Sequence, residues 1–173
     1  MIGFRVLASC LLFVAWPLLA ADHATSPPGP PAIAVLVDGK TTTTLDHAAL
    51  AALPRASVTA ATHDEKPAQW QGVALEEIVH RAGVPEGTAM RGRAMARFVR
   101  VTGSDGYQVV FSAGELDPTF GNTQVILAEQ KDGQTLSADG PYRLVVPGDK
   151  RAARWVRNVA TIEVMDASTR PPG

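Results

Sequence analysis

Short runs in which apolar and polar side chains alternate recur along the chain, and this period of two predicts β-strands. Residues 32–37 alternate small and branched apolar side chains, and the threonine-rich stretch 40–45 follows them. Asp38-Gly39 between the two stretches is typical of a two-residue hairpin turn. The same pattern predicts further strands at 57–62, 69–73, 98–102, 107–111, 123–129, 142–146 and 155–164, with turns at 104–106 and 131–133.

Only three short stretches have the residues that begin or end a helix. Asp46 is placed to cap a helix over 47–53. Residues 75–82 put their apolar side chains on one helix face, and Gly83 is suited to end that helix. A Ser-x-x-Glu capping box at 112–115 predicts one more helical turn. Many short strands with few helices predict the α+β class, as a β-rich mixed single domain.

The N-terminal end predicts a cleavable export signal over residues 1–21. Arg5 supplies the positive charge, an apolar stretch covers 6–20, and Ala20-Ala21 offers small residues for cleavage. The apolar stretch has about 15 residues, fewer than the ~20 that cross a bilayer as a helix, so an uncleaved anchor is the weaker alternative. A lipoprotein box at Cys10 is discounted because most of the apolar segment follows it. We expect a bacterial periplasmic protein.

The composition of the chain after removal of the signal predicts how the mature protein is organised. The proline-rich residues 22–31 predict a tether, residues 32–166 one domain, and residues 167–173 a flexible tail. The mature chain has about 150 residues, enough for a core of its own and without a membrane-inserted segment. Cys10 is the only cysteine and leaves with the signal, so no disulfide or thiolate ligand remains. The full chain has a net charge of −1, which becomes −2 when Arg5 leaves with the signal, and this balance does not fit a general nucleic-acid binder.

The segment 147–157, Pro-Gly-Asp-Lys-Arg-Ala-Ala-Arg-Trp-Val-Arg, concentrates basic residues in a mildly acidic protein. A Pro-Gly turn that leads into arginines can present N–H groups to an anion or a flat polar heterocycle. Trp155 offers a ring for stacking, and Asp105 and Tyr107 beside a hairpin turn offer hydrogen bonds. The alternative interpretation is a solvated basic loop with Trp155 in the core.

No catalytic constellation is visible in the residues themselves. Of the four histidines only His63 lies at the end of a predicted strand, and no second set of metal ligands accompanies it, so we predict no metal site. Trp70 is interpreted as a packing residue rather than a platform for a ligand. The chain has no Gly-x-Ser-x-Gly motif and no glycine-rich phosphate loop.

Seven segments nevertheless occur in an informative order. They are 53–54, 57–59, 70–75, 82–84, 105–107 with Ser112, 140–148 and 153–157. Their order resembles the molybdopterin-binding domain of the sulfite oxidase family, over about residues 53–164. The resemblance implies the sulfite-oxidase-type molybdopterin-binding fold in a reduced form.

The resemblance also implies a pterin site that lacks its metal ligand. Arg143 and Arg157 match the positions that contact the pterin cofactor in the family, and Arg154 matches the arginine inside the closing motif. The family's molybdenum-ligand cysteine follows the strand that resembles 57–62, where this chain has Ala-Thr-His-Asp at 61–64. Threonine cannot replace a soft thiolate without changing the metal chemistry. We therefore expect a pterin or molybdopterin-like ligand without molybdenum.

Small exported proteins of this cysteine-lacking form include a periplasmic pterin-binding regulator of an inner-membrane cyclic-di-GMP enzyme. By this resemblance we expect a non-catalytic ligand sensor that acts on such a membrane partner. The expected ligand-binding residues are Asp105, Tyr107, Arg143, Arg154, Trp155, Arg157 and His63. Two alternatives stay open. One is a molybdopterin-dependent oxidoreductase in which His63 or a non-protein ligand replaces the cysteine, and the other is an interaction domain that does not use the pocket.

Overall fold

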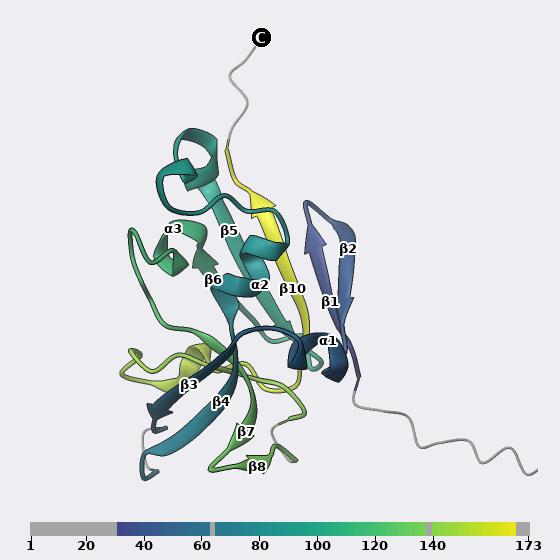
Figure 1. The fold of residues 1–173 in the computed structure, drawn as a ribbon, viewed down its shortest axis with the longest axis vertical. Coiled ribbons are helices and arrows are strands. Elements are labelled where there is room, and N and C mark those ends of the chain that lie inside the picture. The colour runs from purple at the N-terminus through teal and green to yellow at the C-terminus, as the bar shows by residue number, and fades with distance from the viewer. Residues whose placement is uncertain (1–30, 63–64, 138–139, 169–173) are drawn as a thin grey trace, which may run out of the picture.

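The computed structural model describes residues 31–62, 65–137 and 140–168. The predicted signal, nearly all of the tether, His63 and most of the predicted tail lie outside these residues. Within them the chain forms two five-stranded sheets and a few short helices (Figure 1). The predicted α+β, β-rich class is therefore confirmed.

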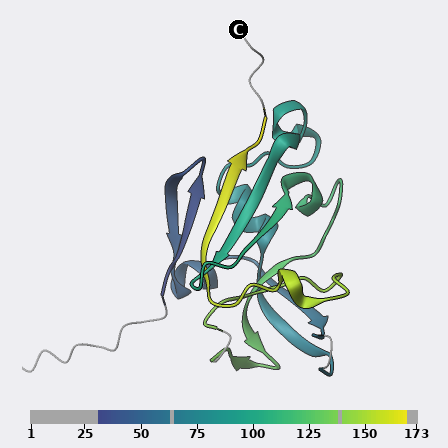
Figure 2. The same cartoon turned by 180° about the vertical axis from the view of Figure 1, so that it is seen from behind.

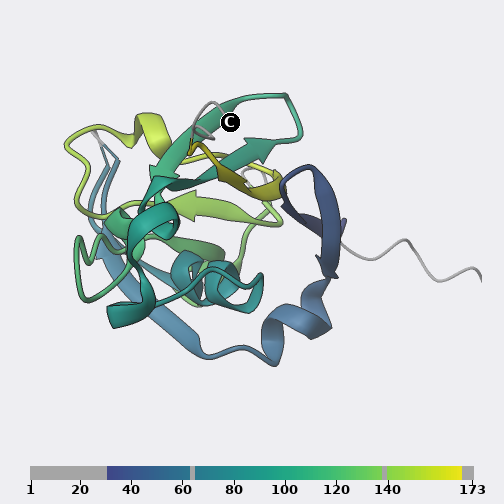
Figure 3. The same ribbon diagram turned by 90° about the horizontal axis from the view of Figure 1, so that it is seen from above.

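The first sheet has the order β2-β1-β10-β5-β6. Its C-terminal strand β10 pairs with β1 in parallel and with β5 in antiparallel fashion, so the two ends of the domain meet at the centre of this sheet. Figure 3 shows the hairpin β1–β2 at one rim, beside the yellow β10. The strands are β1 (Ile33–Val37), β2 (Lys40–Leu45), β5 (Arg97–Gly103), β6 (Gln108–Ser112) and β10 (Val159–Asp166).

The second sheet has the order β3-β4-β7-β8, and β9 also pairs with β7. All of these pairs are antiparallel. Gly72 in β4 permits the close pairing with β7, because a Cβ atom there would lie 1.9 Å from the carbonyl oxygen of Leu127. The strands are β3 (Arg55–Ala60), β4 (Ala68–Ala74), β7 (Ile126–Lys131), β8 (Gln134–Thr135) and β9 (Arg143–Val145).

The helices begin where the capping residues predict. The Asp46 side chain accepts a hydrogen bond from the Ala49 N–H at 2.8 Å, and the capping box of Ser112 and Glu115 forms. Gly83 follows the second helix with a φ of +95°, which glycine adopts easily. The helices are α1 (His47–Ala51), α2 (Leu75–Arg81) and α3 (Ala113–Leu116), with 3₁₀ turns η1 (Gly87–Ala89), η2 (Gly92–Ala96) and η3 (Ala152–Arg154). No helix among the described residues is long and apolar enough to span a bilayer.

Two tryptophans join the second sheet to the segment that follows η3. Trp70 of β4 and Trp155 meet edge to face, with ring centroids 5.7 Å apart and planes at 86°. The Trp70 indole N–H donates to the Ala60 carbonyl at 3.2 Å, and the Trp155 indole N–H donates to the Val146 carbonyl at 3.0 Å. Both rings are therefore buried with their polar atoms paired, and Trp70 is a packing residue as predicted.

The strand predicted over 155–164 is wrong in its first four residues. Residues 155–158 run beside β9 through isolated bonds, from the Leu144 N–H to the Val156 carbonyl and from the Val159 N–H to the Tyr142 carbonyl. Asn158 has a φ of +47°, which ends any extended run before β10 begins. An apolar pattern cannot reveal a left-handed residue of this kind.

Other predicted boundaries move by two or three residues. The strand predicted at 57–62 is β3 and begins and ends two residues earlier, and the strand predicted at 123–129 begins only at Ile126. Thr123 is held outside the sheet because its N–H bonds to the Glu115 carbonyl. The short β8 and the 3₁₀ turns were not predicted, since two- to five-residue elements carry no periodicity.

Replacing Gly72 with alanine tests the close approach of β4 and β7. We expect Gly72→Ala to destabilise the domain by about 1–3 kcal/mol, because the new methyl group meets backbone that cannot move aside. Urea unfolding of the purified domain measures this change. Gly148→Ala is the control, since no atom lies within 4 Å of its added Cβ. Equal stability of the two variants would contradict the interpretation.

Candidate functional site

A small pocket of about 220 Å³ lies between the tip of the β5–β6 hairpin and η3. In Figure 2 the yellow-green η3 lies at about the same height as the tip of this hairpin, above the strands of the second sheet. The pocket brings together four of the seven ligand-binding residues expected from the sequence. Its lining residues are Asp105, Tyr107, Ala152, Ala153, Trp155 and Arg157.

One hydrogen bond fixes Asp105 inside the hairpin tip, and another joins the tip to the segment that follows Trp155. The Asp105 Oδ1 accepts from the Tyr107 N–H at 2.9 Å, and the Ser104 N–H donates to the Asn158 carbonyl at 2.9 Å. Gly103 allows this contact, because a Cβ atom there would lie 2.8 Å from both the Arg157 carbonyl oxygen and the Asp105 Oδ1. The positions of Asp105 and Arg157 relative to one another thus depend on a glycine between them.

Tyr107 connects the hairpin to η3. Its hydroxyl donates to the Ala153 carbonyl at 2.6 Å, and half of the residue is exposed to solvent. The tyrosine therefore presents an accessible aromatic ring beside the pocket while its polar end is fixed. Among the pocket-lining residues, Tyr107 therefore has a much more exposed ring than Trp155.

Trp155 belongs mainly to the core, although one part of it reaches the pocket. It is 5% exposed, and its ring packs against Trp70. The guanidinium carbon of Arg143 lies 5.6 Å from the Trp155 ring centroid and 5.3 Å from the Trp70 centroid. The structure thus places Trp155 where the alternative interpretation put it, with Arg143 against its ring.

Arg143, in β9, is 5% exposed and does not line the pocket. Lys131 lies over the Trp70 ring at 5.1 Å and makes an ion pair with Glu65 at 2.9 Å. The pKa of the Glu65 carboxyl is lowered, mainly by the hydrogen bond and charge of Lys131 and to a smaller extent by Arg143. Arg143 and Lys131 thus pack against the tryptophan rings and do not line the pocket.

Arg154 also lies outside the set of pocket-lining residues. Its Nε and Nη2 donate to the two carboxylate oxygens of Asp149 at 2.9 and 2.6 Å, and its Nη1 donates to Glu115 at 2.9 Å. These bonds raise the pKa of Arg154, with the Asp149 hydrogen bond as the largest cause. His63 lies outside the described residues, so its expected role has no structural counterpart here.

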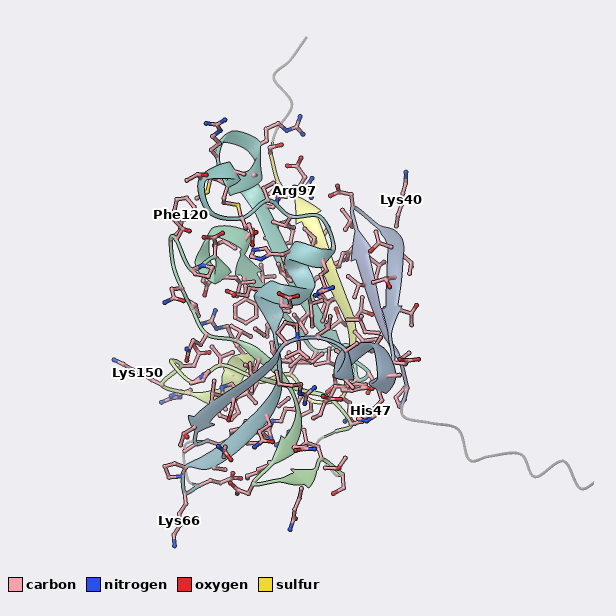
Figure 4. The ribbon with its side chains drawn as sticks, in the orientation of Figure 1. Lys40, His47, Lys66, Arg97, Phe120 and Lys150 are labelled. Carbon is pink, nitrogen blue, oxygen red and sulfur yellow. The ribbon has the colours of Figure 1, made fainter. Side chains whose placement is uncertain are left out.

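A second pocket, of about 290 Å³, lies beside α1 and was not predicted. Its buried Glu129 accepts from Arg55 at 2.5 Å and from His47 at 3.0 Å. Burial raises the pKa of Tyr142 in the same wall, with a smaller effect of the Glu129 charge. Figure 4 shows His47 and Lys150, which precedes η3, on opposite sides of the molecule. No motif signals this pocket, because its lining residues are scattered from 47 to 142.

The first pocket offers hydrogen-bonding groups and an aromatic ring. A carboxylate, a guanidinium group and an exposed phenol ring converge there from the hairpin and from the segment after η3. No group of three His, Cys, Asp or Glu side chains able to hold a metal occurs among the described residues. The pocket volume of about 220 Å³ lies below the ~300 Å³ lower end typical of small-molecule sites.

Comparison with known proteins supports the molybdopterin-binding fold that the sequence predicts. The family model of the oxidoreductase molybdopterin binding domain matches residues 31–171. The crystal structure of the sulfane dehydrogenase SoxCD from Paracoccus pantotrophus is similar, with a TM-score of 0.62 and 18% sequence identity. The match covers 79% of this chain and 38% of the SoxCD chain. No curated protein matches the sequence.

The bond between Tyr107 and the Ala153 carbonyl can be tested by Tyr107→Phe, which keeps the ring. We expect a stability loss below about 1 kcal/mol, because the bond is partly exposed. We also expect faster hydrogen exchange in 152–157, because η3 loses its connection to the hairpin. Hydrogen-exchange mass spectrometry of parent and variant measures this effect. Unchanged exchange in 152–157 would show that the hydroxyl does not hold η3.

Proposed function

The chain belongs to the oxidoreductase molybdopterin-binding domain family, and from this premise we propose that it is a periplasmic pterin-binding protein without catalytic activity. The pterin ring occupies the pocket between the β5–β6 hairpin and η3. The observation that carries this proposal is the convergence of Asp105, Tyr107 and Arg157 on one pocket.

The pocket groups are complementary to the edges and the face of a pterin. The Asp105 carboxylate has acceptor capacity beyond its bond to the Tyr107 N–H, and it accepts from the amino group and the adjacent ring N–H of the ligand. Arg157 donates to the ring oxygen and nitrogen acceptors. Tyr107 supplies the aromatic surface for stacking.

The family also contains oxidoreductases, and the residues of this chain favour binding over oxygen transfer. Cys10 is the only cysteine, and it lies in the predicted signal, so the domain offers no thiolate to molybdenum. The second candidate function is a molybdopterin-dependent oxidoreductase in which His63 or a non-protein group completes the metal site. The family match favours that candidate as much as it favours binding.

The proposed role of the bound pterin is signalling to a membrane partner. The predicted export signal places the domain on the periplasmic side, where it meets the periplasmic domains of inner-membrane enzymes. We propose that the partner is an inner-membrane cyclic-di-GMP enzyme. The third candidate, an interaction domain independent of the pocket, predicts that pocket variants capture this partner as well as the parent does.

The ligand and the metal are measured together on protein purified from a periplasmic extract. Denaturation releases the ligand, and we expect pterin fluorescence in stoichiometric amount and no molybdenum by elemental analysis. Molybdenum together with pterin would establish the oxidoreductase alternative. Absence of both, followed by failure of pterin titration, would contradict pterin binding altogether.

The site itself is tested with Asp105→Ala and Arg157→Ala. Each variant should lower pterin affinity about tenfold or more, because a hydrogen bond to a charged group contributes roughly 1.5–3 kcal/mol. Fluorescence titration measures the dissociation constant. Asp132→Ala and Arg91→Ala are the controls, since Asp132 occupies the turn of another hairpin and neither residue lines the pocket. Parent-like affinity in both pocket variants would show that the pterin binds elsewhere.

A further inference from the structure

Arg154 lies between two carboxylates and an aromatic ring, and it is not among the residues that line the pocket. Asp149 receives two of its hydrogen bonds and Glu115 a third, all between 2.6 and 2.9 Å. Its guanidinium carbon also lies 4.6 Å from the Phe111 ring centroid. The planar guanidinium is thus engaged along its edge and on its face, which suits arginine and no other side chain.

The Glu115 carboxylate, which accepts one of these bonds, is itself held in place. Glu115 forms the capping box of α3, in which its N–H donates to the Ser112 hydroxyl and its Oε2 accepts from the Ser112 N–H. Its carbonyl accepts from the Thr123 N–H. Arg154 is therefore attached to a rigid corner where β6 ends and α3 begins.

The backbone around Arg154 forms one wall of the pocket. Ala152 and Ala153 precede it and Trp155 follows it, and all three line the pocket. The Val156 N–H donates to the Arg154 carbonyl at 3.1 Å, and Arg157 comes directly after. A shift of the Arg154 backbone therefore moves the wall and changes the position of Arg157.

From this geometry we infer that Arg154 is a positioning residue, which fixes the η3 wall to the β6–α3 corner and does not contact the ligand. The inference rests on the proposed function, in which this pocket binds a pterin ring. It differs from the role that the sequence motif implies, since there Arg154 is grouped with the ligand-binding arginines. Only Arg157 of the closing motif then faces the ligand.

The test removes the charges of the two Arg154 partners in one variant and the Arg154 side chain in another. Glu115→Gln with Asp149→Asn keeps the shapes of both side chains and removes their charges, and neither residue lines the pocket. We expect the double variant and Arg154→Ala to weaken pterin binding by similar factors, about tenfold. Arg154→Lys should restore little of the affinity, because an ammonium group cannot bond to both carboxylates in this geometry.

A second ligand separates positioning from contact. Titrations with pterin and with 6-carboxypterin should show the same fold-loss for Arg154→Ala, because a displaced wall affects both ligands alike. Arg93→Ala is the control, since it removes an exposed ion pair with Asp166 and should change neither affinity. Melting temperatures of all variants, recorded in parallel, identify any that fail to fold.

Three results would overturn the inference. The first is parent-like affinity in Arg154→Ala. The second is parent-like affinity in the Glu115 and Asp149 double variant while Arg154→Ala loses binding. The third is a larger loss of affinity for 6-carboxypterin than for pterin in Arg154→Ala. If the parent binds no pterin, the proposed function fails instead. The attachment of η3 through Arg154 is then tested by hydrogen exchange in 152–157. Exchange there should be faster in Arg154→Ala and in the double variant, and unchanged in Arg93→Ala.

Discussion

The edge-to-face contact between Trp70 and Trp155 is the interaction on which the pocket region depends. Trp70 belongs to the second sheet, and Trp155 lies in the segment between η3 and the central strand β10 of the first sheet. Both indole N–H groups are bonded to carbonyls, so the pair is buried without an unpaired donor. Once Trp155 is anchored, η3 and Arg157 on either side of it have little freedom. The hairpin tip then packs against residues whose positions are already set.

The arginines of the closing segment divide into two groups because of the local backbone. The 3₁₀ turn η3 ends at Arg154, which pairs with Glu115 at the β6–α3 corner, whereas Arg157 lies in the segment after the turn and lines the pocket. Arg143 lies in β9 and packs on the tryptophan pair. The same residue type thus contributes to packing, to an ion-pair network and to the proposed ligand site.

The proposed function combines a retained recognition surface with a missing metal ligand. Pterin recognition needs hydrogen bonds and an aromatic face, which Asp105, Arg157 and Tyr107 provide. Oxygen transfer at molybdenum additionally needs a ligand set for the metal, and the thiolate of the family is not available after the predicted signal.

By itself, the sequence determined the β-rich class, three hairpin turns, the helix caps and the family, because each depends on local backbone preferences or on motif order. It also grouped Asp105, Tyr107, Trp155 and Arg157 as candidate ligand-binding residues. Tertiary structure alone decided which groups meet: the exposed ring is Tyr107, Trp155 is core, and Arg154 pairs with Glu115, 39 residues away. It also formed the α1-side pocket from scattered positions, and it moved the start of the strand expected over 155–164 to Val159, after the left-handed Asn158. These outcomes depend on packing between distant segments, which neither periodicity nor a motif encodes.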